Sequence, residues 1–310
     1  MKSFVPVCAA ALLFLAHPVL AGPLSTAQVT AGADWVVHAD YDQFNKSELG
    51  RLIRAELGQL GLEQKMLDFE TVFSFHPLDD IHSVTIYGSG DDQEKAVVLI
   101  DGTFETEKLV SLVRMNPQYE RIDYGNFTLH SWVDENKKDP NAPGRRMYGC
   151  VYKDNLVLVS AGLPWLKQAV DVLAGTAPNA AGSFKQAVLD KKGAFLQLAV
   201  NAVGTIAQNN RKAALLRQTE ELGAVFGEDE GIVYVNLSLK AVSEDVALNV
   251  KKMLDGIIAF MSIAGGEKPV LADIASKLDV TCVDRTITLY FRSEPTAVVS
   301  FLKERWKVQK

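Results

Sequence analysis

The stretch Cys150-Val-Tyr-Lys-Asp-Asn-Leu-Val-Leu-Val159, followed by Pro164 and an apolar helical pattern, has a counterpart later in the chain. The counterpart is Cys282-Val-Asp-Arg-Thr-Ile-Thr-Leu-Tyr-Phe291, followed by Pro295 and a second such pattern. In each copy two strand-like segments flank a short turn, and proline is favoured in the first turn of a helix. The spacings from Cys to Pro differ by one residue, which a hairpin tip absorbs easily. The pair therefore predicts a hairpin followed by a helix in each half of the chain.

Further matches upstream extend this likeness into an internal repeat. The segment Leu99–Leu109, a strand followed by a capped helix, matches Leu237–Ala247. The opening strand at Trp35 matches a strand at Ala194. The same order of elements in both halves favours duplication of one unit over chance similarity.

The repeat sets the expected fold class and domain organisation. We expect an α+β protein of two similar units, each a largely antiparallel sheet with amphipathic helices on one face. The first unit spans 33–173 and the second 184–310, and the small and polar residues of 174–182 form the linker between them. In the second unit, the segment that follows Val200 is expected to be helical as far as Phe226.

The first 21 residues show the three parts of a secretory signal peptide. Lys2 supplies the positive charge, the run from Phe4 to Ala16 is apolar, and Val19 and Ala21 are small residues suited to a cleavage site. The apolar run is short for a membrane span, so a retained anchor is the less favoured alternative. We expect an exported chain, periplasmic or secreted after cleavage near Ala21, with no membrane span in the mature protein.

The composition excludes several broad classes of protein. The chain has 310 residues, of which 48% are hydrophobic and 23% charged, with a net charge of −6. These values are close to those of an average globular protein and unlike those of a disordered, collagen-like or polytopic membrane chain. A net negative chain with only small basic clusters is not expected to bind nucleic acid.

Two cysteines remain after signal cleavage, Cys150 and Cys282. In an exported protein they could form one disulfide bond. Both lie in strand-like segments, where a free cysteine packs as a small hydrophobic residue, so two buried thiols are favoured over a bridge. The repeat predicts that they occupy equivalent places in the two units.

The signal peptide and the repeated order of elements carry a resemblance over most of residues 33–306. The chain resembles exported bacterial proteins, from families of unknown function, that are built as a duplicated α+β unit behind a signal peptide. The resemblance rests on the order of elements and a few residues such as Cys150 and Cys282. It implies a fold and an exported location, and it implies no activity.

One cluster of residues could supply metal ligands for an enzyme. His38 and Asp40 alternate on the opening strand, and His76 and His82 follow after the next helix. Histidine and carboxylate groups can bind a metal ion that activates water. The structural explanation is favoured, because turn and cap roles account for these residues and no metal-ligand motif has the required spacing. We therefore predict no catalytic residue, no cofactor and no metal, with these four residues as the candidates if a metal site exists.

Two further features each allow a functional and a structural explanation. Cys150 and His130 could form a thiol–imidazole pair, but a cysteine within an apolar strand is usually inert. The helix from Ser243 to about Ile263 is rich in apolar residues and is expected to pack on the sheet. The alternative for this helix is a partly exposed apolar face that contacts a partner or a membrane.

The sequence thus favours an exported, non-catalytic binding or interaction protein. Its partner would be another envelope protein or a small ligand held between the two halves. The alternative is an extracytoplasmic metal-dependent hydrolase that uses His38, Asp40, His76 and His82.

Overall fold

The computed structural model describes residues 22–59, 61–134, 144–185, 191–203, 216–265 and 269–308. The predicted signal peptide lies outside these residues, as do the centre of the polar segment 134–146 and most of the segment 201–215.

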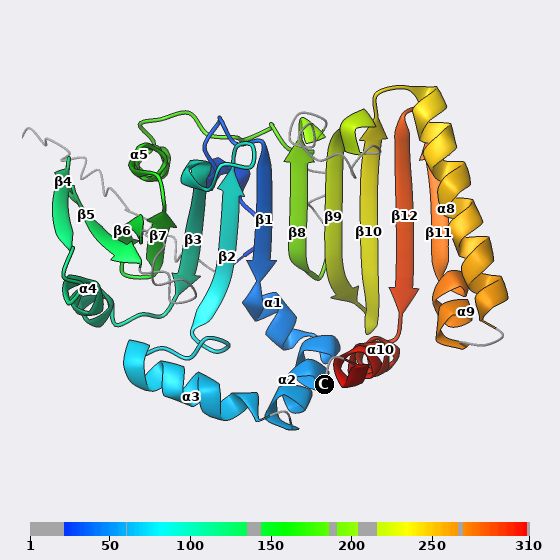
Figure 1. Ribbon diagram of the computed structural model, residues 1–310, viewed down its shortest axis with the longest axis horizontal. Helices are drawn as coiled ribbons and strands as arrows, with labels where there is room; N and C mark the ends of the chain where they lie inside the picture. Colours follow the sequence, from blue (N-terminus) through cyan, green and yellow to red (C-terminus); the bar gives the residue numbers. More distant parts are fainter. Residues whose placement is uncertain are drawn as a thin grey trace, which may run out of the picture.

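The strands of the described residues form one continuous sheet of twelve strands in which every neighbouring pair is antiparallel (Figure 1). Their order across the sheet is β11-β12-β10-β9-β8-β1-β2-β3-β7-β6-β5-β4. The bounds of the strands are β1 Trp35–Asp40, β2 Ile81–Gly88, β3 Ala96–Gly102, β4 Glu120–Tyr124, β5 Phe127–Asp134, β6 Arg145–Lys153, β7 Leu156–Ser160, β8 Ala194–Asn201, β9 Thr219–Asp229, β10 Ile232–Ala241, β11 Leu278–Val283 and β12 Thr286–Ser293.

Helices connect the strands and lie along the rims of this sheet. The α-helices are α1 Tyr41–Lys46, α2 Glu48–Gln59, α3 Leu62–Phe73, α4 Thr106–Arg114, α5 Leu163–Leu173, α8 Glu244–Ala264, α9 Pro269–Ser276 and α10 Pro295–Val308. The predicted α+β class and its largely antiparallel sheet are therefore confirmed. The sheets expected for the two units are joined edge to edge, because β1 pairs with β8.

The order of strands outward from the β1–β8 pair follows the chain in the same way on both sides. On one side it runs β1, β2, β3, β7, β6, and on the other β8, β9, β10, β12, β11. Cys150 lies on β6 and Cys282 on β11, at matching places in this order. Hairpin β4–β5 has no counterpart among the described strands. The order agrees with the expected repeat, but duplication of one unit stays a prediction, because equal order does not establish that the halves superpose.

The helical expectation for the segment that ends at Phe226 is wrong over residues 219–226, which belong to strand β9. This strand pairs along its length with β8 on one side and β10 on the other. Such pairing between distant segments outweighs the local helix preference of a short stretch. Residues 204–215 of the same prediction lie outside the described residues.

One face of the first half of the sheet carries the main hydrophobic core. Along β1 the side chains alternate between half-buried and buried, and β3 and β7 follow the same alternation. The buried set packs against α5 and the segment that leads into β1. Its largest fully buried apolar members are Val29, Val36, Tyr87, Val97, Leu99, Leu129, Leu158, Leu166 and Val170.

The other face of the sheet is apolar but is covered by helices only in part. Helices α2 and α10 pack on it near Val233, and α8 packs near Leu239 and Ile287. In the second half, the side of β10 opposite to these contacts carries polar residues such as Asn236, Ser238 and Lys240. The helices therefore frame the apolar face along its rims instead of covering it fully.

A contact between the two halves fixes the start of one rim helix. The carboxylate of Glu228, on β9, accepts hydrogen bonds from the backbone N–H groups of Glu48 (2.9 Å) and Leu49 (2.8 Å) at the start of α2. A carboxylate at this place satisfies free N–H groups and complements the helix dipole. It ties α2, from the first half, to a strand of the second.

Candidate functional site

A pocket of about 300 Å³ opens between helices α3 and α4 and the apolar face of the sheet. We refer to it as the apolar pocket. Its walls come from both helices and from strands β2, β3, β5, β6 and β7. The residues that line it are Phe69, Phe73, Phe75, Ile81, Ile100, Phe104, Leu109, Val110, Leu112, Val113, His130, Trp132, Gly149, Cys150, Val151, Val157 and Val159. Apart from the thiol of Cys150 and the indole N–H of Trp132, His130 is the one lining residue with a polar side chain.

An aromatic cluster attaches α3 to this pocket. Phe69 and Phe73 are one helical turn apart and stack with their ring centroids 4.3 Å apart. Phe75 meets Phe69 edge to face at 5.1 Å and Phe104 at 5.2 Å, so it links α3 to the loop before α4. Such pairs add to the free energy gained from burial and hold the rings at fixed angles. The aromatic wall of the pocket is therefore a defined surface.

The floor of the pocket depends on a glycine. Gly149, on β6, is paired with His130 on β5, and the ring of Trp132 lies close to it. A Cβ at Gly149 would stand 3.1 Å from Cζ3 of Trp132, which is closer than ordinary van der Waals contact. The absence of a side chain at Gly149 lets the Trp132 ring lie this close to the strand at the floor of the pocket.

His130 contributes a buried polar side chain to the wall of this pocket. Its side chain is 7% exposed, and its Nδ1 lies 2.9 Å from the hydroxyl of Tyr119. Burial lowers the pKa of His130, and the charges of Arg114 and Arg121 lower it further. The ring is therefore neutral at physiological pH. Its Nε2 has no hydrogen-bond partner among the described residues.

The register of the sheet places His130 at one end of a continuous row of paired residues. From β5 to β12 the row consists of His130, Gly149, Val159, Val98, Ile86, Val37, Leu198, Ala224, Leu237 and Leu289. On the far side of His130, the partner on β4 is Arg121. Residues paired in this way share one face of a sheet. The apolar face thus runs across both halves and ends at an imidazole and a guanidinium group.

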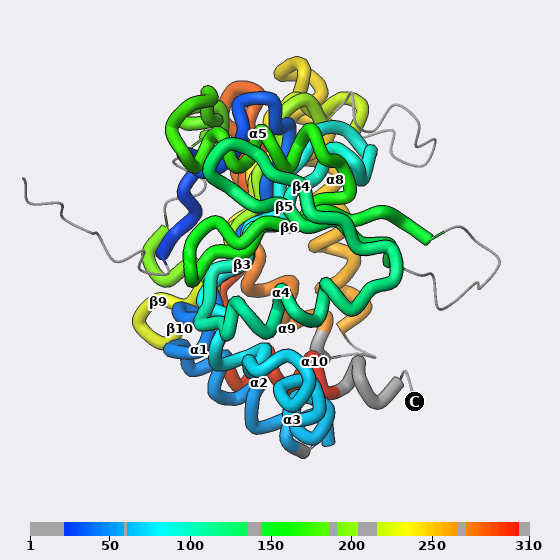
Figure 2. The backbone as a smooth tube through the Cα atoms, turned by 90° about the vertical axis from the view of Figure 1, so that its left-hand side faces the viewer, coloured from blue at the N-terminus to red at the C-terminus, as the bar shows by residue number. Residues whose placement is uncertain are grey.

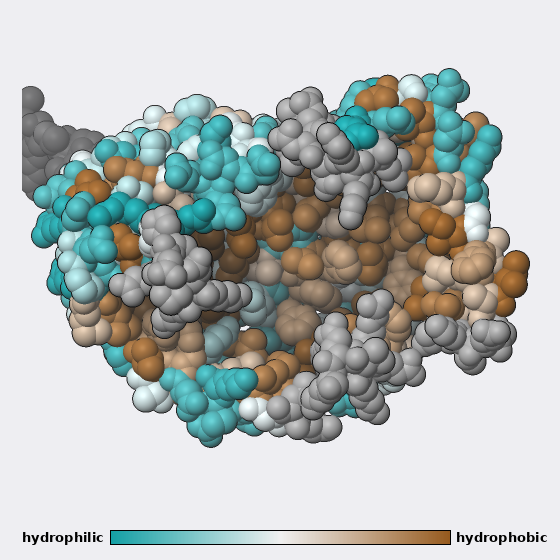
Figure 3. Space-filling model, viewed as in Figure 1, coloured by the Kyte–Doolittle hydropathy of each residue, from teal (hydrophilic) through white to brown (hydrophobic). Residues whose placement is uncertain are grey.

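The apolar face is visible as a hydrophobic hollow (Figure 3). Most side chains of the row are half-buried, and Leu237 is 37% exposed. Viewed along the long axis of the molecule, α4 lies to one side of strands β4–β6 and α5 to the other (Figure 2). The hollow and the apolar pocket meet at Val159, which lines the pocket and belongs to the row.

Helix α8 lies at the far end of the same face. Ala247 and Val250 are buried against the sheet, as the sequence predicted, whereas several other apolar side chains are exposed. The exposed set is Leu248, Met253, Ile257, Phe260 and Ile263. Among the described residues, no helix has the length and apolar character needed to cross a membrane.

The four candidate metal ligands are not brought together. His38 is buried on the core face of β1, where Nδ1 lies 2.8 Å from Thr85 Oγ1 and Nε2 lies 3.2 Å from the carbonyl of Gly22. Asp40 caps α1 by accepting a hydrogen bond from the backbone N–H of Gln43 at 2.7 Å. These contacts are structural.

The other two histidines have carboxylate partners of their own. His76 Nδ1 lies 2.9 Å from Asp79, and His82 Nδ1 lies 3.1 Å from Asp42. Asp42 lies in helix α1, beyond the end of strand β1. Within the described ranges, no group of three or more His, Cys, Asp or Glu side chains could hold a metal ion. The geometry therefore adds nothing in favour of the hydrolase alternative.

A small polar pocket of about 70 Å³ lies beside His38, with Asp101 and Ser83 among its lining residues. Asp101 accepts a hydrogen bond from Asn155 Nδ2 at 2.6 Å, and burial raises the pKa of its carboxyl group. Burial also lowers the pKa of His38, although Asp40 opposes this shift. The pocket is of a size for ordered water and is closed by the segment from Gly22 to Gln28.

The two cysteines are free thiols on distant strands. Nine strand spacings separate β6 from β11, which corresponds to roughly 40 Å and excludes a bridge between them. Cys150 is buried in the core beside Leu129, and burial raises its pKa to about 11. It lies on the core side, so it does not pair with His130. Cys282 is only half-buried.

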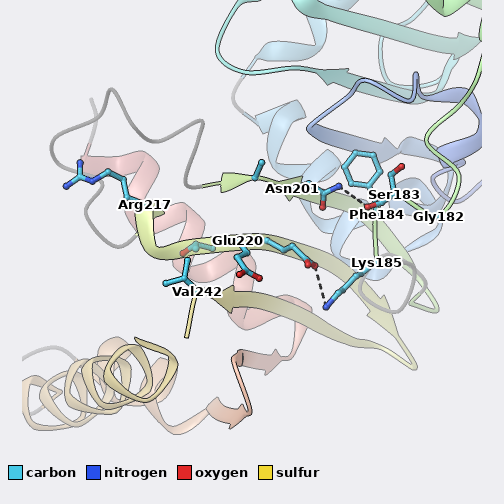
Figure 4. A pocket seen from close by; sticks show the side chains of 11 residues that line it. Gly182, Ser183, Phe184, Lys185, Asn201, Arg217, Glu220 and Val242 are labelled. Carbon is cyan, nitrogen blue, oxygen red and sulfur yellow. Dashed lines mark hydrogen bonds and ion pairs between the residues drawn. The ribbon is translucent and has the colours of Figure 1, made fainter. Parts of the chain in front are cut away.

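A second, wide pocket of about 880 Å³ lies at the ends of β8 and β9 (Figure 4). Its charged side chains include Lys185 and Glu221, which form an ion pair at 3.4 Å. Glu220 and Glu221 are also paired with Lys240. Because these opposite charges are matched to one another, this pocket presents no evident preference for a charged ligand.

The comparisons with known proteins give only a distant likeness. No family model and no curated protein matches the chain. Among solved structures, crystal form I of a protein called TP0453 aligns with 91% of this chain and 98% of its own, at 8% identity and a TM-score of 0.48. Crystal forms III and IV of the same protein give TM-scores of 0.45, at 8% and 9% identity. A likeness at this level indicates neither activity nor partner.

Proposed function

We propose that this chain is an exported, non-catalytic binding protein whose ligand is an apolar molecule held in the apolar pocket. One observation carries the proposal: a pocket lined almost entirely by apolar side chains opens onto a partly uncovered apolar sheet face. An apolar surface of this extent, framed by polar rims, is typical of a ligand or partner site.

The size of the pocket sets the width of the ligand. About 300 Å³ is at the lower end of the range for small-molecule sites. It suits a single hydrocarbon chain, and the row of residues from Val159 to Leu289 offers a path for a longer one. Each buried methylene contributes about 0.8 kcal/mol, so a chain of about ten methylenes gains enough free energy for useful affinity after the cost of ordering it.

The predicted export supports the proposal of an apolar ligand. Apolar molecules are poorly soluble in water, and a protein that shields them is useful in an aqueous compartment outside the cytosol. The predicted signal peptide is tested by the mass of the protein recovered from the envelope or medium. Cleavage after Ala21 predicts a chain that begins at Gly22, whereas an intact chain in the cytosol would contradict export.

The binding proposal is tested by titrating dodecanol, a neutral single-chain probe, into the purified protein below its solubility limit. Calorimetry or the fluorescence of Trp132, which lines the pocket, reports binding. Val110→Asp places a carboxylate in the pocket wall, and Ser111→Asp makes the same change at the next residue, which is exposed. We expect the first variant to lose binding by more than about tenfold and the second to keep it. Equal binding by both variants, or no binding by the wild type, would overturn the proposal.

A further inference from the structure

The polar end of the apolar pocket, at His130, says more about the head group of a ligand than the apolar walls do. Among its lining residues, the side chains that could donate a hydrogen bond to a ligand oxygen are the indole of Trp132, the weak thiol of Cys150 and the imidazole of His130. Of these, His130 is the one that ends the apolar row and is paired with Arg121 on β4. It is more than nine-tenths buried, and Tyr119 occupies only its Nδ1. When the Tyr119 hydroxyl donates to Nδ1, the neutral ring carries its hydrogen on Nε2. That Nε2–H group is then a donor without a hydrogen-bond partner among the described residues.

The charges around His130 favour an anion. Arg121 is its direct partner on β4, and Arg114, at the end of α4, is close enough to lower its pKa. Arg121 also contacts Asp123 at 2.9 Å, and nearby Arg146 contacts Glu120 at 3.4 Å. Arg114 has no carboxylate partner among the described residues. Of these three arginines, Arg114 is therefore the one whose charge is not matched by a carboxylate of the described residues.

These observations fit one class of ligand. We propose that the apolar pocket selects a fatty-acid anion, whose carboxylate accepts a hydrogen bond from His130 near Arg114 and whose hydrocarbon chain lies against the apolar row. The proposal rests on the proposed function and names the ligand class for the same site. A lipid with two chains does not fit a pocket of about 300 Å³, whereas one chain with a small head does.

The geometry explains why a carboxylate is preferred over a hydroxyl group. A hydrogen bond to a charged acceptor contributes more to binding than one between neutral groups, and more still where water is excluded. A ligand carboxylate gives Nε2 of His130 an acceptor that it lacks among the described residues. The unmatched charge of Arg114 adds a smaller contribution, because this side chain is exposed and screened by solvent.

The test compares monomeric dodecanoate with dodecanol, which has the same chain and a neutral head. We expect wild-type protein to bind dodecanoate about tenfold more tightly. His130→Leu should remove this preference while dodecanol binding remains, which also shows that the variant is folded. Arg114→Gln, a change at an exposed residue, should reduce the preference by roughly threefold. Lys252→Gln, which removes an exposed positive charge on α8, is the matched control and should have no effect.

The outcomes separate the two proposals. If wild-type protein binds dodecanoate and dodecanol equally, or if His130→Leu keeps the preference, the carboxylate proposal fails while the apolar binding function stands. If neither probe binds, the proposed function itself fails. A preference that depends on both His130 and Arg114 supports the assignment of the head-group position.

Discussion

Trp132 lies across Gly149, so that a Cβ at Gly149 would stand 3.1 Å from the Trp132 ring. The pair lies on neighbouring strands beneath the apolar pocket and faces α4. A large aromatic ring and a bare backbone position together shape the floor of the pocket. The pocket therefore depends on a packing relationship that substitution at one residue can disturb.

Gly149→Val is expected to weaken binding of dodecanol by about tenfold, which corresponds to about 1.4 kcal/mol. The added side chain displaces the Trp132 ring into the pocket and occupies part of its volume. The measurement is calorimetric titration of the variant beside wild-type protein. Gly125→Val, at a glycine away from the pocket whose backbone angle φ is +58°, controls for general destabilisation. Unchanged affinity in the Gly149 variant would show that ligand does not reach this floor.

The uncovered part of the sheet predicts an unusual tolerance to polar substitution. Leu237 is 37% exposed on the apolar face, whereas Leu99 is 2% exposed in the core. We expect Leu237→Lys to change the free energy of unfolding by no more than about 0.5 kcal/mol. Leu99→Ala should cost about 2–5 kcal/mol. Denaturant titration measures both, and a large loss for Leu237→Lys would mean that this face is covered in solution.

The stability of the protein should fall in mild acid because of His38. Burial lowers its pKa below the ordinary value of 6.5, so the folded state resists protonation. As the pH falls below 6.5, the unfolded chain binds a proton that the folded chain does not, and the free energy of unfolding decreases until the folded-state pKa is reached. His130 has a shift of the same sign.

This prediction is checked by denaturant titration at about pH 7.5 and about pH 5.5, on either side of the unfolded-state pKa. His38→Gln keeps a polar side chain beside Thr85 and removes the titrating ring, so the variant should lose less stability between the two conditions than wild-type protein. An equal loss in both proteins would exclude His38 as a source of the acid sensitivity.

The thiols should react at different rates in the folded chain that begins at Gly22. Cys150 is buried and its pKa is raised to about 11, so its reactive thiolate is scarce. Cys282 is half-buried near the edge of the sheet. A maleimide reagent should label Cys282 first and Cys150 only on unfolding, as peptide mass analysis would show. Rapid labelling of Cys150 would indicate that the core beneath β6 opens readily.

The sequence predicted the local elements whose signals lie within a few residues. The turn at Lys153-Asp154-Asn155 joins β6 to β7, and Ser243 caps α8 by accepting a hydrogen bond from the N–H of Val246 at 3.3 Å. Turn and cap preferences act through neighbouring residues, so they are readable from the chain alone. Strand β9 was missed because its stability comes from pairing with β8 and β10, which lie outside any local window.

The candidate site was not predictable in the same way. Phe69, Phe73 and Phe104 have the composition of ordinary core residues, and the aromatic-rich segment 69–75 was the one signal that could have drawn attention to α3. A core residue and a pocket residue differ in how much of the side chain is covered by neighbouring elements. That coverage depends on where the helices pack on the sheet. The sequence indicates His130 only as a partner for Cys150, because the place of His130 at the end of an apolar row follows from the register of many strand pairs.

The central claim is tested most directly by determining the structure of the chain with dodecanoate bound. We predict that the hydrocarbon chain lies between α4 and strands β5–β7, with a carboxylate oxygen within hydrogen-bond distance of Nε2 of His130. An empty apolar pocket, with dodecanoate bound elsewhere on the protein or not at all, would contradict the account.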